Sequence, residues 1–331
     1  MKKLFYISVL LCISIFTFIA SSEVLLRISG FEPWKYFSID LNRPTVHEPD
    51  QILGWRNKPG KYQFPPYHPS GEKVELTFLP NNSRNTGKPG GDYNGELIFV
   101  GGSFTQGAAI SDHETFPWKL QKRYPSLKSL NFATSGYGTY QSLLMLEKIM
   151  PDLKSPKLVI YGFIVTHEMR NIAHSSWLEP IAKHSRQGNI YLPYVTSGKD
   201  KNLIRNRPEK YIELPFREKS ALIAFAEKQI MEFKTKNRKQ FRRLLTGKLV
   251  QEMDKLSKVN GAKFIVALLQ AEEKIKKEYI SFLEYNNISY VDCSFSMTKD
   301  MTVLGEGHPN GKMNSQWAEC ISERLDSFIP E

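Results

Sequence analysis

The chain reads ELIFVGGSFTQG from Glu96 to Gly107, and this stretch decides the fold. The residues up to Val100 form a short, mostly apolar run that glycines close, and a helical pattern follows from Glu114. Such a run is typical of a buried parallel strand that ends in a tight turn. Ser103 then lies at the carboxyl end of that strand. In open α/β sheets this edge is where ligands bind.

Three glycine-loop motifs do not fit this stretch. A phosphate-binding loop needs a lysine after its last glycine, but Ala108 follows Gly107. A dinucleotide-binding fingerprint needs Gly-x-Gly-x-x-Gly, and that spacing fails from either Gly101 or Gly102. The nucleophile elbow Gly-x-Ser-x-Gly has Thr105 at its last position. A strand-end serine remains, and since such a serine alone is more often structural than nucleophilic, its partners decide the interpretation.

Strands and helices alternate after this turn. We predict strands at 97–100, 127–133, 157–165, 263–269 and 288–293, and helices at 114–124, 139–150, 219–241, 248–259, 272–285 and 312–328. Because the connections are short, the alternation predicts an α/β fold with a five-stranded parallel sheet and helices on both faces.

We expect three parts along the chain. Residues 1–22 form a signal peptide or a signal-anchor helix, residues 23–94 a preface that packs on the main domain, and residues 95–331 the main domain. The preface is rich in Pro, Gly, Asn and aromatic residues, and a short hairpin is compatible with its extended pieces. The polar segment 172–215 interrupts the alternation, so we predict an insertion near the carboxyl edge of the sheet.

The first twenty residues combine two lysines with an uncharged apolar run from Leu4 to Ala20. Lysines ahead of such a run stay on the cytoplasmic side, so we predict that the rest of the chain is exported. The small residues Ala20 to Ser22 suit a signal peptidase, yet the run is also at the short limit for a membrane span. Both outcomes stay open. We favour an inner-membrane anchor that faces the periplasm or the cell exterior, whereas cleavage would give a secreted protein.

The chain is basic, with 45 Lys and Arg against 34 Asp and Glu and a formal net charge of +11. This charge permits attraction to anionic lipid headgroups, acidic polysaccharides or nucleic acid. Seven basic residues and no acidic residue lie from Lys234 to Lys248. No nucleic-acid-binding motif accompanies them, so we expect a solvated helix face or a membrane-facing patch and no nucleic-acid partner.

The cysteines and histidines predict neither a metal site nor a cofactor. Outside the apolar run only Cys293 and Cys320 remain, and in an oxidising compartment they either pair or stay as two buried thiols. His167 and Glu168 begin like the zinc-protease motif His-Glu-x-x-His, but Asn171 occupies the place of the second histidine.

Three further segments place candidate catalytic residues at the carboxyl edge of the predicted sheet. The loop GEGHPN before the last helix holds His308, with Glu306 two residues ahead of it. A carboxylate in that place fixes the tautomer of an imidazole that acts as a general base. Residues 131–138 and 166–171 follow the second and third predicted strands at the same edge. A backbone N–H in the glycine-rich segment 131–138 can point at a developing oxyanion.

Together these segments resemble the SGNH (GDSL-like) hydrolase superfamily, which contains esterases, lipases, thioesterases, sugar-ester deacetylases and acyltransferases. Residues 101–107 look like its Gly-Asp-Ser block, 131–141 like its glycine block, and 306–310 like its closing Asp-x-His block. The order matches over roughly residues 95–329. The segment LGWRNKPG at 53–60 also resembles the preface of exported or anchored bacterial members. The resemblance implies a flavodoxin-like three-layer sandwich.

The resemblance also implies roles for individual residues. Ser103 is the nucleophile, His308 the base and Glu306 the orienting carboxylate. The backbone N–H groups of Ser103 and Gly136 form an oxyanion hole. His167 stands where the family presents an asparagine side chain, and a neutral imidazole can donate one N–H to the same oxygen.

The implied function is a serine esterase that acts through an acyl-Ser103 intermediate. We expect O-acyl substrates, especially O-acetyl esters of a cell-envelope or extracellular polysaccharide or of a small molecule. The alternatives are a sugar O-acetyltransferase, a lipid esterase or thioesterase, and a catalytically weak glycan-binding protein of polysaccharide assembly. The last gains weight because position 102 is Gly and position 306 is Glu where the family has aspartates, and position 167 is His where the family has an asparagine. The acyl group, the acceptor and the oligomeric state stay open.

Overall fold

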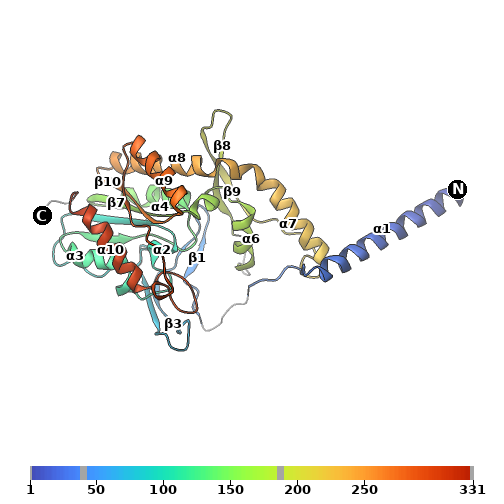
Figure 1. Ribbon diagram of the computed structural model, residues 1–331, viewed down its shortest axis with the longest axis horizontal. Helices are drawn as coiled ribbons and strands as arrows, with labels where there is room; N and C mark the ends of the chain where they lie inside the picture. Colours follow the sequence, from blue (N-terminus) through green and yellow to red (C-terminus); the bar gives the residue numbers. More distant parts are fainter. Residues whose placement is uncertain (1, 38–42, 185–189, 329–331) are drawn as a thin grey trace. The chain divides into compact units, whose positions relative to one another are not determined.

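The computed structural model describes residues 2–37, 43–184 and 190–328 (Figure 1). The chain divides into two compact units. Unit 1 consists of residues 1–39, 174–190 and 210–239, and unit 2 consists of residues 40–173, 191–209 and 240–331. The predicted insertion at 172–215 is therefore shared between the two units.

A five-stranded parallel sheet forms the centre of unit 2. Its strands are β5 (Glu96–Gly101), β6 (Lys128–Asn131), β7 (Pro156–Ile164), β10 (Lys263–Gln270) and β11 (Ser289–Asp292). They lie in the order β11-β10-β7-β5-β6, and every neighbouring pair is parallel. This confirms the predicted sheet. The chain order reverses between β5 and β7, which is the switch point where ligands bind in open α/β sheets.

Helices cover both faces of the sheet, which gives the predicted three layers. They are α3 (Phe116–Arg123) and α10 (Gly311–Leu325) on one face, and α4 (Thr139–Ile149) and α8 (Arg242–Val259) on the other, with α9 (Glu273–Tyr285) next to β11. Side chains alternate between the faces of a strand, so Leu97 and Phe99 of β5 pack with Trp317 of α10. All six residues of β5 are buried, as expected for a strand inside a parallel sheet.

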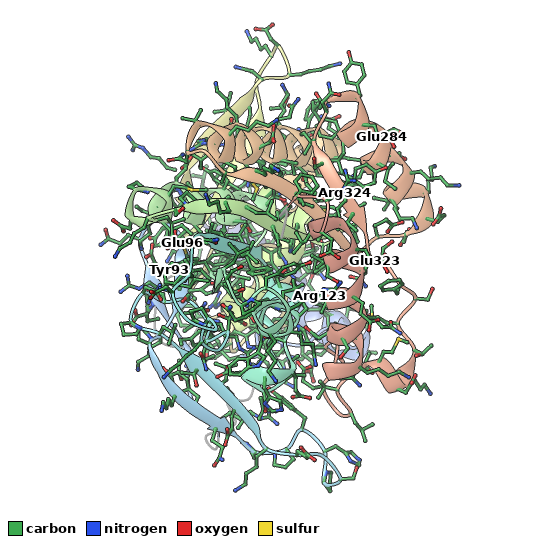
Figure 2. All side chains as sticks on the ribbon, turned by 90° about the vertical axis from the view of Figure 1, so that its left-hand side faces the viewer. Tyr93, Glu96, Arg123, Glu284, Glu323 and Arg324 are labelled. Atoms are coloured by element: carbon green, nitrogen blue, oxygen red, sulfur yellow. A yellow bond between two sulfur atoms is a disulfide. The ribbon has the colours of Figure 1, made fainter. Side chains whose placement is uncertain are left out.

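All strands of the sheet begin at the same edge. Figure 2 labels residues at this edge, among them Glu96 at the start of β5, Arg123 at the end of α3 and Arg324 near the end of α10. The buried carboxylate of Glu96 accepts hydrogen bonds from two backbone N–H groups ahead of β7, each at 3.1 Å. The strands end at the opposite edge, where the turn after β5 carries Ser103.

The preface contains two antiparallel strand pairs, where the sequence suggested one short hairpin. β1 (His47–Asp50) pairs with β2 (Gly54–Asn57), and β3 (Gly60–Phe64) pairs with β4 (Val74–Phe78). Alternate residues of β4 are buried, so one face of the second pair packs inward.

A buried arginine ties the preface to the main domain of unit 2. The guanidinium of Arg84 is buried, pairs with Asp112 (3.0 Å), and donates to the carbonyl oxygens of Gln106 (2.7 Å) and Ile110 (2.6 Å). A guanidinium offers five donors in a fixed fork, which suits a loop that presents several carbonyls. Arg84 therefore holds the loop that follows the Ser103 turn.

Some predicted boundaries were wrong. Helix α8 begins at Arg242 rather than at 248, and the glycine at 247 lies inside the helix. A Cβ at Gly247 would lie 2.8 Å from the ring of Phe282 in α9, so the glycine allows close packing of the two helices. The segment 172–215 holds more regular structure than its polar sequence indicated: α6 (Ser175–His184) in unit 1, and the hairpin β8 (Leu192–Ser197) with β9 (Leu203–Glu209) in unit 2.

Unit 1 contains the predicted amino-terminal hydrophobic helix. This helix, α1 (Lys2–Ile28), has no buried residue and is long and apolar enough to cross a membrane. Near its end, Glu23 accepts hydrogen bonds from the backbone N–H groups of Ala221 (3.0 Å) and Leu222 (2.8 Å) at the start of α7 (Ala221–Thr235). The first N–H groups of a helix have no partner within the helix. The Glu23 carboxylate therefore caps α7.

Candidate active site

The backbone at the end of β5 needs glycine. Gly101 has a φ of 153°, and a Cβ there would lie 2.5 Å from Thr105 Oγ1 and 2.8 Å from the carbonyl oxygen of Gly162. Neither contact is tolerable, so only glycine lets β5 turn at once into the short helix α2 (Ser103–Gln106). Ser103 is the first residue of α2 and is 6% exposed.

Three predicted site residues lie in one hydrogen-bonded chain. The Oγ of Ser103 is 3.0 Å from Nε2 of His308, and Nδ1 of His308 is 2.6 Å from Oε1 of Glu306. The second carboxylate oxygen of Glu306 accepts the backbone N–H of His308 at 2.8 Å. Glu306 therefore holds both the ring and the backbone of His308. The loop before α10 and the turn after β5, far apart in the sequence, meet at the carboxyl edge of the sheet.

A hydrogen bond between two of its own residues closes the loop that carries His308. The backbone N–H of Val303 donates to the carbonyl of His308 at 2.7 Å, and Gly305 and Gly307 have φ angles of 83° and 92°, which side chains rarely adopt. Asn310 then caps α10, because its Oδ1 accepts two backbone N–H groups of the first turn. The position of His308 is thus fixed from both ends.

The Glu306 carboxyl is ionised in this setting. Partial burial raises its pKa, but the hydrogen bonds from the ring and the backbone of His308 and the nearby charge of Arg43 outweigh burial, so the pKa lies below its usual value. A carboxylate, rather than a carboxylic acid, therefore faces the imidazole.

The predicted oxyanion donors lie in turns beside each other. Residues 134–137 form a turn in which the N–H of Tyr137 donates to the carbonyl of Thr134 (3.1 Å), with Gly136 at a φ of 85°. The N–H of Thr134 donates to the carbonyl of Gly101 (3.1 Å), which places this turn next to the turn that carries Ser103. Within the described part of the chain, the backbone N–H groups of Ser103 and Gly136 have no hydrogen-bond partner. Both are free to bind an oxygen atom.

His167 is completely buried beside the same turn. Its Nδ1 is 2.7 Å from the hydroxyl of Tyr161, whereas its Nε2 is buried and has no hydrogen-bond partner among the described residues. A Cβ at position 102 would lie 2.8 Å from that Nε2. Burial, together with the charge of Arg170, lowers the pKa of His167 well below its usual value, so the ring is neutral.

A buried polar network that the sequence did not reveal supports His167. The Tyr161 hydroxyl is also 2.7 Å from the hydroxyl of Thr139, which accepts a hydrogen bond from the side chain of Asn171 at 3.0 Å. Asn171 in turn donates to Thr246 of α8 at 2.8 Å. The available signal was a tyrosine within an otherwise apolar buried strand, since a buried hydroxyl needs partners.

Glu168, the next residue, is engaged in ion pairs. Its carboxylate lies 2.8 Å from Arg242 and 2.9 Å from Arg243, and it accepts a hydrogen bond from the hydroxyl of Tyr279 at 3.0 Å. Two members of the basic run at 234–248 thus neutralise a buried carboxylate. Among residues 2–37, 43–184 and 190–328, no three His, Cys, Asp or Glu side chains are grouped so as to hold a metal ion.

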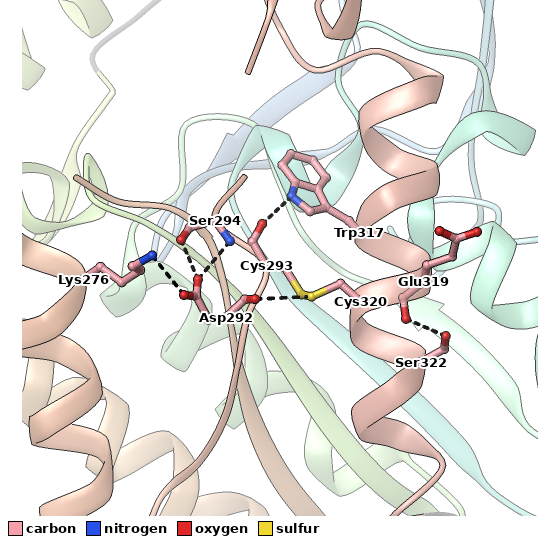
Figure 3. Close-up of a disulfide and its surroundings, with 8 residues drawn as sticks. All are labelled: Lys276, Asp292, Cys293, Ser294, Trp317, Glu319, Cys320 and Ser322. Atoms are coloured by element: carbon pink, nitrogen blue, oxygen red, sulfur yellow. Dashed lines mark hydrogen bonds and ion pairs between the residues drawn. A yellow bond between two sulfur atoms is a disulfide. The ribbon is translucent and has the colours of Figure 1, made fainter. Parts of the chain in front are cut away.

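A disulfide joins Cys293 and Cys320, which resolves the two possibilities that the sequence left open (Figure 3). Cys293 follows β11 and Cys320 lies in α10, so the bond closes the segment that includes Glu306 and His308. The indole of Trp317 donates to the carbonyl oxygen of Cys293 at 3.0 Å. The start of the loop and the helix after it are therefore fastened together.

No protein-family model matches the chain, and no curated protein matches it in sequence. Solved structures that resemble it include a member of the lipolytic protein G-D-S-L family from Veillonella parvula DSM 2008, at 10% identity over 70% of this chain and 97% of that chain, with a TM-score of 0.41. The esterase EstA from Pseudoalteromonas sp. has 12% identity over 70% of this chain and 100% of its own, with a TM-score of 0.41. A catalytic mutant of the acetylxylan esterase Axe2 from Geobacillus stearothermophilus has 12% identity over 71% of this chain and 95% of its own, with a TM-score of 0.35.

The G-D-S-L family is the family that the motifs of this sequence resemble. At such identities and TM-scores the likeness says nothing of the activity of this chain. The evidence for an activity is the geometry of Ser103, His308 and Glu306.

Proposed function

We propose that this protein is a serine esterase that hydrolyses O-acyl esters through an acyl-Ser103 intermediate. The proposal rests on two hydrogen bonds in series. One joins Ser103 Oγ to Nε2 of His308, and the other joins Nδ1 of His308 to the Glu306 carboxylate. A serine becomes a nucleophile when a base accepts its proton and a third group orients that base. Both requirements are met within hydrogen-bond distance.

In the first half of the reaction, Ser103 Oγ attacks the acyl carbon while its proton passes to Nε2 of His308. The carbonyl oxygen becomes an oxyanion, which the N–H groups of Ser103 and Gly136 stabilise. The intermediate collapses, the bond to the alcohol oxygen breaks, and His308 returns the proton to that oxygen. In the second half, His308 accepts a proton from water, the resulting hydroxide attacks the acyl carbon, and Ser103 leaves with the proton from His308.

The two departures from the family pattern are compatible with this mechanism. The side chain of Glu306 is one methylene longer than that of aspartate, yet its Oε1 lies 2.6 Å from Nδ1 of His308. Its other oxygen accepts the backbone N–H of His308, and this second hydrogen bond holds the carboxylate in place. Gly102 is required by its surroundings, since His167 and Arg170 fill the space that a side chain would occupy. His167 as a third oxyanion donor stays a proposal, for which the unpartnered Nε2 beside Gly102 is the support.

We propose O-acetyl esters of a cell-envelope or extracellular polysaccharide as the substrate class. The support is the predicted export of the chain and the family resemblance. A series of acyl esters of rising chain length, together with acetylated sugars, tests this point. Fastest turnover of the acetyl esters is expected, and a preference for long acyl chains or thioesters would overturn the substrate class while leaving the esterase in place.

The activity itself is tested by covalent labelling of the full-length protein in detergent with a fluorophosphonate probe. We expect the wild type and the Ser126→Ala variant, which alters an exposed serine, to be labelled. We expect no labelling of Ser103→Ala and loss of most labelling in His308→Ala. Absence of labelling in a folded wild-type protein would overturn the esterase and favour glycan binding.

We also propose that α1 is a retained membrane anchor, with the rest of the chain in the periplasm or outside the cell. A peptidase needs an extended substrate, whereas α1 runs as one helix through Ala20 to Ser22, and Glu23 caps α7. The mass of the protein extracted from membranes tests this. We expect the full-length chain to resist alkaline extraction, and a mature chain that starts after residue 20 or 22 would contradict the anchor.

A further inference from the structure

We propose that Trp55, in strand β2 of the preface, is a positioning residue that aims the N–H of Gly136 at the oxyanion. The proposal rests on the proposed function, because it concerns the oxyanion hole of the same site. It extends the site to a residue outside the three blocks that resemble the family.

The N–H of Gly136 belongs to a peptide unit with two stable orientations. The turn at 134–137 has Gly136 at its third position with a φ of 85°, which is a type II turn. Rotation of the peptide between Ser135 and Gly136 by about 180° converts type II into type I and moves φ of the third residue to about −90°. Glycine adopts both values readily.

The hydrogen bond of the turn does not select between these orientations. The bond from the N–H of Tyr137 to the carbonyl of Thr134 belongs to both turn types. A contact from outside the turn must therefore fix the direction of the Gly136 N–H. The structure shows such a contact, since the carbonyl oxygen of Ser135 accepts a hydrogen bond from the indole of Trp55 at 2.9 Å.

The hydrogen bond to the Ser135 carbonyl also fixes the direction of the Gly136 N–H, because both groups belong to the same peptide. In a trans peptide the C=O and the N–H point in opposite directions. With the Ser135 carbonyl directed at Trp55, the Gly136 N–H is directed away from β2, and it has no partner among the described residues. In the flipped orientation the carbonyl would leave the indole, and a buried donor without a partner is unfavourable.

Trp55 is itself held firmly. It is 6% exposed, and its ring packs edge-on against Tyr137 at 5.7 Å between centroids. The hydroxyl of Tyr137 donates to the backbone carbonyl of Trp55.

A neighbour of Trp55 in β2 makes two further contacts to the same region. The side chain of Asn57 donates to the carbonyl of Ala133 at 3.1 Å and accepts from Gln106 of α2 at 2.7 Å. Strand β2 thus spans the oxyanion turn and the nucleophile helix, and Trp55 is its contact to the peptide that carries the donor.

The test is the Trp55→Phe variant, which removes the indole N–H and keeps an aromatic ring. We expect kcat for an activated acetyl ester to fall about 10- to 100-fold, a fraction of the 10²–10³-fold that loss of a whole oxyanion donor costs. We expect KM to change less than about twofold, because ground-state binding does not use the oxyanion contact. A purely structural role would not produce this split.

The matched control is Trp34→Phe. Trp34 is also 6% exposed, but its Nε1 has no hydrogen-bond partner among the described residues, so the change removes aromatic area without removing a bond. We expect the control to keep kcat within about twofold. A folded Trp55→Phe protein with kcat as high as that of the control overturns the proposal.

A second variant keeps the proposal open to refutation if Trp55→Phe fails to fold. Gly136→Ala disfavours the positive φ of the type II turn and favours the flipped peptide. We expect kcat to fall with KM preserved, and an unchanged kcat overturns the proposal, because the direction of the Gly136 N–H would then not matter for the reaction. Failure of the proposed function is distinct, since the wild type would then show neither turnover nor labelling at Ser103.

Discussion

At the scale of single residues, Glu306 is the proposed orienting group for His308. It binds His308 through both carboxylate oxygens, and its pKa lies below the usual value. We expect Glu306→Gln to lower kcat by roughly 10²–10⁴-fold, because the amide neither stabilises the imidazolium nor fixes its tautomer. Steady-state kinetics checks this, with the exposed Glu273→Gln as control. Equal kcat in the two variants would remove Glu306 from the mechanism.

Gly102 and His167 are complementary in shape. A Cβ at 102 would lie 2.8 Å from Nε2 of the buried ring. We expect Gly102→Ala to cost about 1–3 kcal/mol of stability through overpacking. The double variant Gly102→Ala/His167→Ala should be less destabilised than the sum of the single variants. Denaturant unfolding measures all three, and Gly91→Ala, with open space around it, is the control. Strict additivity would show that the two positions are independent.

The same histidine predicts a dependence of stability on pH. In the folded protein burial, aided by Arg170, keeps the pKa of His167 well below the usual 6.5, and its partner Tyr161 is uncharged. Below pH 6.5 the unfolded chain binds a proton at this residue and the folded protein does not, so the free energy of unfolding falls as pH falls.

Between pH 7 and 5.5 this effect amounts to about 1 kcal/mol. We expect the loss of stability over that interval to be smaller by this amount in His167→Asn than in the wild type. Urea unfolding at the two pH values is the measurement. The same loss in both proteins would mean that His167 is protonated in the folded state.

At the scale of elements, the disulfide joins the end of β11 to α10 and encloses the loop that bears His308. We expect the double variant Cys293→Ser/Cys320→Ser to lose about 2–4 kcal/mol of stability. It should also lose kcat, since the position of His308 depends on both ends of that loop. Thermal unfolding and kinetics check this, and Cys12→Ser, which alters the exposed free cysteine of α1, is the control. Unchanged stability would show that the loop needs no cross-link.

At the scale of the whole molecule, the carboxylate of Glu23 joins the end of α1 to the start of α7 within unit 1. Glu23 caps α7 at the backbone N–H groups of Ala221 and Leu222. A helix cap contributes about 1 kcal/mol, so Glu23→Ala should speed hydrogen exchange of these two amides about fivefold. Glu32→Ala, which removes an exposed carboxylate paired with Lys35, should leave their exchange unchanged. Equal exchange in both variants would argue against the cap.

The sequence by itself determined the sheet and the identity of the candidate site. Five short apolar runs between helical patterns indicate a parallel sheet, because such strands are buried on both faces. Ser103, Gly136 and His308 lie in glycine-rich turns or loops at the ends of strands or ahead of a helix. The backbone of such a turn requires particular residue types, so the turn can be recognised in the sequence.

Only the tertiary structure decided how these groups are held. The contacts of Trp55 with Ser135, Arg84 with Gln106, and Asn171 with Thr246 join segments whose spacing follows no period. The ion pairs of Arg242 and Arg243 with Glu168 and the pairing of the two cysteines were hidden for the same reason. A hydrogen bond between distant segments depends on their approach in space, and no pattern along the chain records that approach.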